Sequence, residues 1–231
     1  MSGLGNRYWG EVIEVLRSII PVYDRVNRVI SLGRDEEYRH RGITGRVKPG
    51  NLVLDAGSGY GNMSRVALET TSGGAKIVMY DPIPEMLGKA EFKTENSPAL
   101  TSGVFENMPF QDATFDAVLC GYSLRDAIEL PIAISEMQRV LKTGGRLIIV
   151  DLGKPDGAVA RAFVSFYLKY VLGLLAFAIA GKPGLKFRTL YGTYLRWPQN
   201  ARLELMLREK FSRVEFDRAM LGGAIIVAAY K

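Results

Sequence analysis

A glycine-rich turn between a mostly apolar strand and a helix restricts the fold of this chain more than any other feature. Residues 53–61 read Val-Leu-Asp-Ala-Gly-Ser-Gly-Tyr-Gly, with glycines at Gly57, Gly59 and Gly61. Positions without a Cβ let the backbone bend sharply and approach a ligand closely. A strand-to-helix loop that binds nothing has the same appearance, so the turn predicts a nucleotide site only where its surroundings agree.

The spacing of the glycines and an acidic residue further along the chain narrow the choice of ligand. A dinucleotide-binding turn reads G-x-G-x-x-G, whereas this chain reads G-x-G-x-G after Asp55, which resembles the turn of S-adenosylmethionine-dependent methyltransferases. A second apolar run, 76–80, ends at Asp81, twenty residues after Gly61. In a doubly wound sheet, an acid at this place faces the same crevice and can accept hydrogen bonds from ribose hydroxyls. Asp81-Pro82 also fits a simple turn.

Strand and helix patterns alternate along the rest of the chain. Further strands are expected at 100–104, 117–120, 146–150, 214–216 and 224–230, and helices at 63–70, 84–95, 131–141 and 201–210. This order is typical of a parallel sheet covered on both faces, and a short Gly222-Gly223 link favours antiparallel pairing of the last two strands. We therefore predict an α/β fold with a Rossmann-like, doubly wound sheet of seven strands, mostly parallel with an antiparallel last strand.

The length of 231 residues and the 48% hydrophobic content favour one domain. Its expected parts are a helical N-terminal cap (1–44), a cofactor-binding core (45–153), an apolar helical insertion between strands five and six (154–200), and a C-terminal helix and strand pair (201–231). The cap is amphipathic, and we expect it to fold over the crevice.

An apolar segment at 159–180 carries only Arg161 and Lys169 as charges. Its longest uncharged stretch, 170–181, is shorter than the roughly 20 residues that a spanning helix needs, so no membrane span is expected. One interpretation is a buried core helix. The other is an apolar wall for a lipid-like substrate, or a face that dips into the bilayer interface while nearby lysines and Arg188 meet lipid headgroups.

The net charge and the small number of cysteine and histidine residues argue against several classes of function. The net charge of +6 is spread without a dense basic block, which makes nucleic acid an unlikely partner and fits peripheral contact with an anionic membrane equally well. A single cysteine, Cys120, and a single histidine, His40, leave no disulfide framework and predict no metal site. His40 is expected on the surface of a basic loop. We expect a cytoplasmic protein, with contact at the cytoplasmic membrane face as an option.

Several motifs outside the turn resemble one family, the ubiquinone and menaquinone biosynthesis C-methyltransferases. The matching residues are Tyr23, Asp24, Asn27, Ser31 and Gly33, the segment 106–116, Leu124-Arg125 and the segment 139–147. The resemblance covers nearly the whole chain and is strongest over 22–154. It implies an enzyme that methylates a ring carbon of a prenylated, demethylmenaquinol-like quinol, with S-adenosyl-L-methionine as the methyl donor.

The resemblance also implies cofactor contacts at Tyr60, Asp81, Val104, Phe105 and Gly121. The turn and the Asp-Pro pair add Asp55, Gly57, Gly59, Gly61 and Pro82 to the expected cofactor-binding residues. The chain departs from the family at Tyr60, where a small hydroxyl residue is usual, and at Val104-Phe105, where a polar and then a small residue are usual. Phe105 would stack on adenine or belong to the core.

Three residues are the implied catalytic set, namely Arg125, Asp126 and Tyr23. Ring methylation requires the neighbouring hydroxyl to lose its proton, and a guanidinium, which stays protonated, would hold a water or stabilise the phenolate instead of acting as the base. Asp126 replaces the family's amide, so it would either tether Arg125 or accept the proton. The alternative for Arg125 is a structural ion pair with Asp126. Tyr23 and Tyr122 would donate hydrogen bonds to quinol oxygens or simply pack.

Other functions share these cofactor features. They are methyl transfer to another small or lipid substrate such as a tocopherol precursor or sterol, RNA methylation, and non-catalytic ligand binding. The chain lacks an Asn-Pro-Pro-aromatic motif for nucleic-acid methylation. The aromatic segment 187–197 would offer a contact surface for a homodimer.

Overall fold

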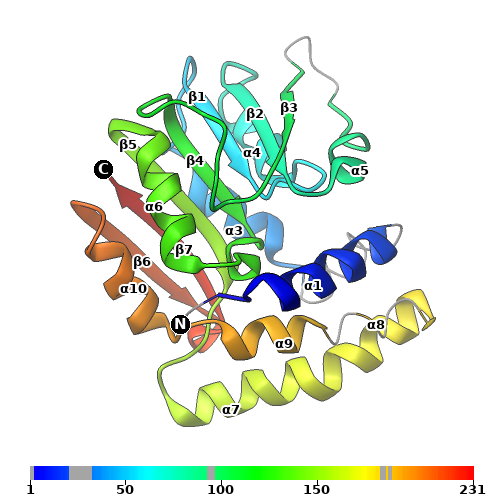
Figure 1. The fold of residues 1–231 in the computed structure, drawn as a ribbon. Coiled ribbons are helices and arrows are strands. Elements are labelled where there is room, and N and C mark those ends of the chain that lie inside the picture. The colour runs from blue at the N-terminus through cyan, green and yellow to red at the C-terminus, as the bar shows by residue number, and fades with distance from the viewer. Residues whose placement is uncertain (1–2, 21–32, 93–96, 183–185, 187–188) are drawn as a thin grey trace.

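A seven-stranded sheet forms the centre of the molecule (Figure 1). The computed structural model describes residues 3–20, 33–92, 97–182, 186 and 189–231. The strands are β1 (Leu52–Ala56), β2 (Lys76–Asp81), β3 (Ala99–Ser102), β4 (Phe115–Gly121), β5 (Leu141–Leu152), β6 (Arg213–Ala219) and β7 (Ala224–Tyr230). Their order is β3-β2-β1-β4-β5-β7-β6, and within this sheet only the pairs that involve β7 are antiparallel. The predicted doubly wound sheet with an antiparallel last strand is confirmed.

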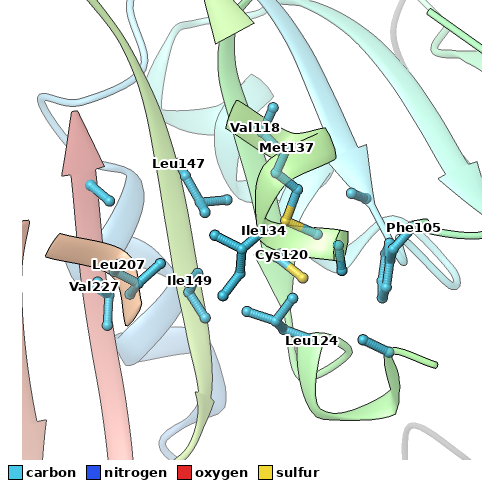
Figure 2. Close-up of a cluster of buried hydrophobic side chains, with 14 of the residues drawn as sticks. Phe105, Val118, Cys120, Leu124, Ile134, Met137, Leu147, Ile149, Leu207 and Val227 are labelled. Carbon is cyan, nitrogen blue, oxygen red and sulfur yellow. The ribbon is translucent and has the colours of Figure 1, made fainter. Parts of the chain in front are cut away.

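Helices cover both faces of the sheet because its central strands bury alternate residues on each side. Val118 and Cys120 of β4 face a cluster built with α6 (Leu130–Val140) and α10 (Asn200–Arg208), as Figure 2 shows. The residues that alternate with them face the opposite cluster. That side is covered by α3 (Asp35–Ile43) and α4 (Asn62–Thr70).

A third group of helices lies beyond the carboxyl ends of the parallel strands (Figure 1). It consists of α1 (Asn6–Ile19), α7 (Ala158–Phe166), a π-helical turn (Tyr167–Val171), α8 (Leu172–Ala180) and α9 (Thr189–Arg196). The predicted N-terminal cap and the helical insertion between strands five and six are therefore present. The helices α7 and α8 and the turn between them run as one continuous helix, which we call the apolar helix.

Element boundaries differ from the sequence prediction where tertiary packing decides them. The helix expected over 84–95 is only α5 (Pro84–Leu87). It ends at Gly88, and Phe92 then leaves the helical path to pack on the cluster under α4. The third strand ends at Ser102, so Val104 and Phe105 belong to the loop after it.

Two expectations concern the apolar helix. The described residues contain one helix, Ala158–Ala178, that is long and apolar enough to cross a membrane by length and composition, although its longest uncharged stretch is short. It is not a buried core helix, because only 17% of its apolar window is buried. Leu168 and Leu172 pack inward, but α7 buries none of its residues.

Candidate active site

The glycine turn after β1 has the left-handed backbone geometry that its glycines permit. All three of its glycines have positive φ, between 53° and 80°. The Gly57 N–H donates to the Tyr80 carbonyl over 2.7 Å, which joins the turn to the end of β2. A Cβ at Gly57 would lie 2.4 Å from Ser123 Oγ and 2.8 Å from Phe105 Cζ. Only glycine therefore fits at this position.

Asp81 stands at the end of β2 and is held by the backbone. Its Oδ2 accepts a hydrogen bond from the Gly59 N–H and its Oδ1 accepts one from the Ile83 N–H, each over 2.8 Å. Burial raises the pKa of Asp81 to about 6, although these two N–H groups oppose the shift. A carboxylate has about four acceptor positions, so both oxygens can still accept further hydrogen bonds.

A cavity lies between this edge of the sheet and α1. Its lining includes six of the predicted cofactor residues, namely Gly57, Gly59, Asp81, Pro82, Val104 and Phe105. Trp9, Ile13 and Leu16 of α1 close it from the other side. Sequence reasoning did not select these three residues, although the amphipathic pattern of the cap indicated a helix over the crevice.

Four predicted cofactor residues do not line this cavity: Asp55, Tyr60, Gly61 and Gly121. Asp55 lies buried beneath the turn. Its Oδ2 accepts hydrogen bonds from Ser64 N–H (3.0 Å) and Ser64 Oγ (2.6 Å), which fastens the first turn of α4 to β1. Burial raises the pKa of Asp55 to about 6.

Tyr60 connects the glycine turn to the cap. Its hydroxyl donates to the Ile20 carbonyl over 2.7 Å, and its ring packs with Ile13 and Met86. We expect Tyr60→Phe to weaken the binding of S-adenosylhomocysteine about fivefold, because one hydrogen bond that holds α1 over the cavity is lost. Calorimetric titration measures this change. The matched variant Tyr230→Phe, which removes a hydroxyl on β7, should bind as the unchanged protein does.

Arg125 is held by a residue that sequence reasoning did not select. Its Nη1 donates to Asp151 Oδ1 over 2.5 Å, and both side chains are buried. The predicted partner, Asp126, is farther away, with 3.9 Å between Arg125 Nε and Asp126 Oδ1. Asp151, at the end of β5, is therefore the close ion-pair partner of Arg125. Burial raises the pKa of Asp126 to about 6, although the charge of Arg125 opposes this shift.

A second, larger cavity lies between α3, the apolar helix and the turn before β7. Its polar and charged lining residues include Arg34, Asp35, Arg39, Tyr122 and Arg125. Its apolar walls include Leu152, Phe163, Val164, Leu168, Leu190, Met220 and Leu221. The apolar helix therefore forms a wall of this cavity, as one of its two interpretations predicted.

Tyr122 lines both cavities. Its φ of 59° is unusual for an aromatic residue, and its N–H donates to the Val150 carbonyl over 2.7 Å. The Arg39 guanidinium lies 5.1 Å from the centre of its ring, and burial raises the pKa of Tyr122 above its ordinary value. Tyr122 is therefore fixed at the boundary between the two cavities.

Some predicted residues lie elsewhere or outside the described residues. Tyr23, expected in the catalytic set, lies outside them. His40, expected on a loop, is in α3, where it forms an exposed group with Glu36 and Glu69 away from both cavities. In the segment expected to form a dimer surface, Tyr194 and Trp197 are buried within the chain.

The glycine turn, the carboxylate after β2 and the antiparallel last strand are together typical of S-adenosylmethionine-dependent methyltransferases, and this chain is one of that class. The chain belongs to the ubiE/COQ5 methyltransferase family, whose sequence profile matches residues 2–231. The resemblance noted in the sequence is thereby confirmed.

Named relatives agree with this assignment. A demethylmenaquinone methyltransferase of Deinococcus radiodurans is 31% identical over 215 residues, which cover 91% of this chain and 88% of that protein. Another from Symbiobacterium thermophilum is 30% identical over 228 residues, covering 93% and 90%.

Solved structures show the same fold at lower identity. A methyltransferase of Aquifex aeolicus matches with a TM-score of 0.57 and 18% identity, covering 89% of this chain and 96% of its own. A Haemonchus contortus N-methyltransferase in complex with S-adenosylhomocysteine matches with a TM-score of 0.58 and 18% identity, covering 80% of this chain and 38% of its own.

Proposed function

We propose that this enzyme methylates a ring carbon of a prenylated, demethylmenaquinol-like quinol. The observation that carries the proposal is the pair of cavities that share Tyr122. One cavity has the residues for the methyl donor, and the other combines mostly apolar walls with a few polar side chains, among them Tyr122 and Arg125. A prenylated quinol has the same two parts, a polar aromatic head and an apolar hydrocarbon tail.

The residues of the first cavity fit S-adenosylmethionine, which supplies a methyl group activated by the positive charge on its sulfur. Asp81 retains acceptor positions for two ribose hydroxyls. Gly57 and Gly59 line this cavity, so their backbone can approach the ligand with no side chain of their own in the way. Phe105 belongs to the buried cluster shown in Figure 2 and also lines this cavity, where its ring would stack on the adenine.

Arg125 would stabilise negative charge on the quinol oxygen. Its guanidinium stays protonated, and the close pair with Asp151 fixes its orientation where it lines the second cavity. Asp151 is the closer tether of Arg125, and Asp126 lies within ion-pair distance of the same guanidinium. Asp126 lines the donor cavity, and a pKa of about 6 leaves its carboxylate ionised at neutral pH and able to accept a proton from the hydroxyl.

The direct test is methyl transfer. We expect labelled S-adenosylmethionine to label a reduced demethylmenaquinol, and a prenylated acceptor to be used about tenfold or more efficiently than the head group alone, because its tail would fill the apolar cavity. The products are measured by chromatography of the lipid extract. Absence of labelled product under reducing conditions would contradict the proposal.

The same assay separates the alternatives. A sterol or tocopherol precursor that outcompetes the demethylmenaquinol would indicate another lipid substrate. Label in RNA, with binding that weakens steeply as salt rises, would indicate nucleic-acid methylation. Binding of the donor without transfer to any acceptor would indicate a non-catalytic module.

A further inference from the structure

We propose that the outer face of the apolar helix, together with the turn at Leu221, docks on an anionic lipid bilayer and opens the second cavity to it. This inference rests on the proposed function in one respect, since a lipid substrate is what gives a membrane-facing cavity its use. The surface itself can be tested without any substrate.

The outer face is a continuous apolar stripe. The exposed large apolar side chains of this helix are Val159, Phe163, Phe166, Tyr170, Leu174 and Phe177, with exposed fractions from 47% to 86%. They are spaced by three or four residues, so they share one side of the helix. Isolated exposed apolar residues are ordinary, but a stripe of six on one helix marks an interaction surface.

The charge around this stripe favours an anionic partner. Residues 159–182, which include nearly all of the apolar helix, contain Arg161, Lys169 and Lys182 and no Asp or Glu. Lys169 lies within the stripe, with its Nζ 4.9 Å from the ring centre of Tyr170. Apolar side chains flanked by lysine and arginine, without acids, are typical of helices that lie in the headgroup region of anionic membranes.

The inner face of the helix determines how it meets the bilayer. Leu168 and Leu172 are at most 1% exposed and pack with Tyr194 of α9 in one cluster. A helix fastened to the domain along one side cannot cross the bilayer without losing this cluster. We therefore infer that it lies in the plane of the interface and does not span the membrane.

The stripe is continuous with the substrate cavity. Phe163, which is 76% exposed, and Leu221, which is 90% exposed, both line the second cavity. Leu221 follows Met220 in a turn where both residues have positive φ, so an apolar side chain is displayed in a costly backbone conformation. Two elements far apart in sequence thus place apolar side chains at the same opening.

Vesicle flotation tests the docking surface. The triple variant Phe166→Ser/Leu174→Ser/Phe177→Ser changes exposed residues that line neither cavity. We expect the protein to float with vesicles of phosphatidylcholine and phosphatidylglycerol more than with phosphatidylcholine alone. The triple variant should partition about tenfold or more weakly.

A matched control removes the same number of exposed apolar residues elsewhere. Leu100→Ser/Ile132→Ser/Leu205→Ser changes residues on β3, α6 and α10 that are 42% to 51% exposed. This control should float as the unchanged protein does. Equal flotation of the stripe variant and the unchanged protein, or no flotation of either, would overturn the proposal.

Two further outcomes would also overturn it. Retention in vesicles after an alkaline wash would mean a spanning helix, and a stripe variant that loses only a dimer in gel filtration would mean that a second copy covers the face. Transfer to a detergent-dispersed quinol separates this proposal from the proposed function. Transfer without flotation rejects docking alone, and flotation without transfer to any quinol rejects the substrate alone.

Discussion

Replacing Arg125 by alanine should lower methyl transfer about a hundred- to thousandfold while S-adenosylhomocysteine binds with its affinity unchanged. The guanidinium lines the second cavity but not the cavity that holds Asp81 and the glycine turn. It is therefore placed to act on the acceptor and not on the donor. Single-turnover rates and calorimetric affinities measure the two effects separately.

The Arg125→Ala variant requires a control, because the loss of Arg125 leaves its partner Asp151 with a buried, uncompensated charge. Breaking such a pair typically destabilises a protein by about 3–5 kcal/mol, so a loss of activity could reflect unfolding. The double variant Arg125→Ala/Asp151→Asn removes both charges and should recover thermal stability without recovering transfer. Recovery of transfer in the double variant, or lost donor affinity in a folded single variant, would contradict the assigned role.

The parts of the fold that depend on local pattern were predictable. The glycine turn, the alternation of buried residues along the central strands and the short link before β7 are all decided within a few residues of sequence. Helix α5 was predicted too long, because Phe92 packs against the cluster under α4 and Gly88 ends the helix. That packing depends on residues far away in the chain.

The sequence predicted individual residues of the site, but not which residues form an ion pair there. The sequence indicated Asp81 and Arg125, but the residue that holds Arg125 is 26 positions away, on β5. The register of β4 against β5 places Gly121 opposite Val150, and so brings the residues after both strands together. Carboxyl ends of adjacent parallel strands share one edge, so a search for acids ending strand five would have found Asp151.

The apolar helix was ambiguous for a different reason. Its composition fits a core, a wall or a membrane surface, and only the direction of each side chain separates these. Leu168 and Leu172 face inward and six large apolar residues face outward, which a hydrophobicity average over 159–180 does not distinguish. Spacing by three and four residues on both faces was visible in the sequence, but the side covered by α9 was not.

Asp81→Asn should weaken the binding of S-adenosylhomocysteine about ten- to hundredfold at neutral pH, since an amide has one acceptor oxygen where the carboxylate has two. The backbone N–H groups of Gly59 and Ile83 already occupy part of that capacity. Calorimetry measures the affinity, and Asp112→Asn, at an exposed position, is the matched control. An unchanged affinity would contradict the ribose role of Asp81.

The titration of Asp81 should affect binding and stability in opposite directions. As pH rises, donor affinity should increase while the stability of the free fold decreases. With a pKa of about 6 in the free protein, the carboxylate is mostly protonated at pH 5, and donor affinity should fall about tenfold there relative to pH 7.5. The same raised pKa stabilises the free fold most below the unfolded-state value of about 4, and this stabilisation is lost as pH rises through 6. Asp55 and Asp126 have pKa values raised in the same direction, so Asp81→Asn should flatten the affinity profile while leaving part of the stability slope. Affinity that strengthens on acidification would show that the ionised carboxylate is not what holds the donor.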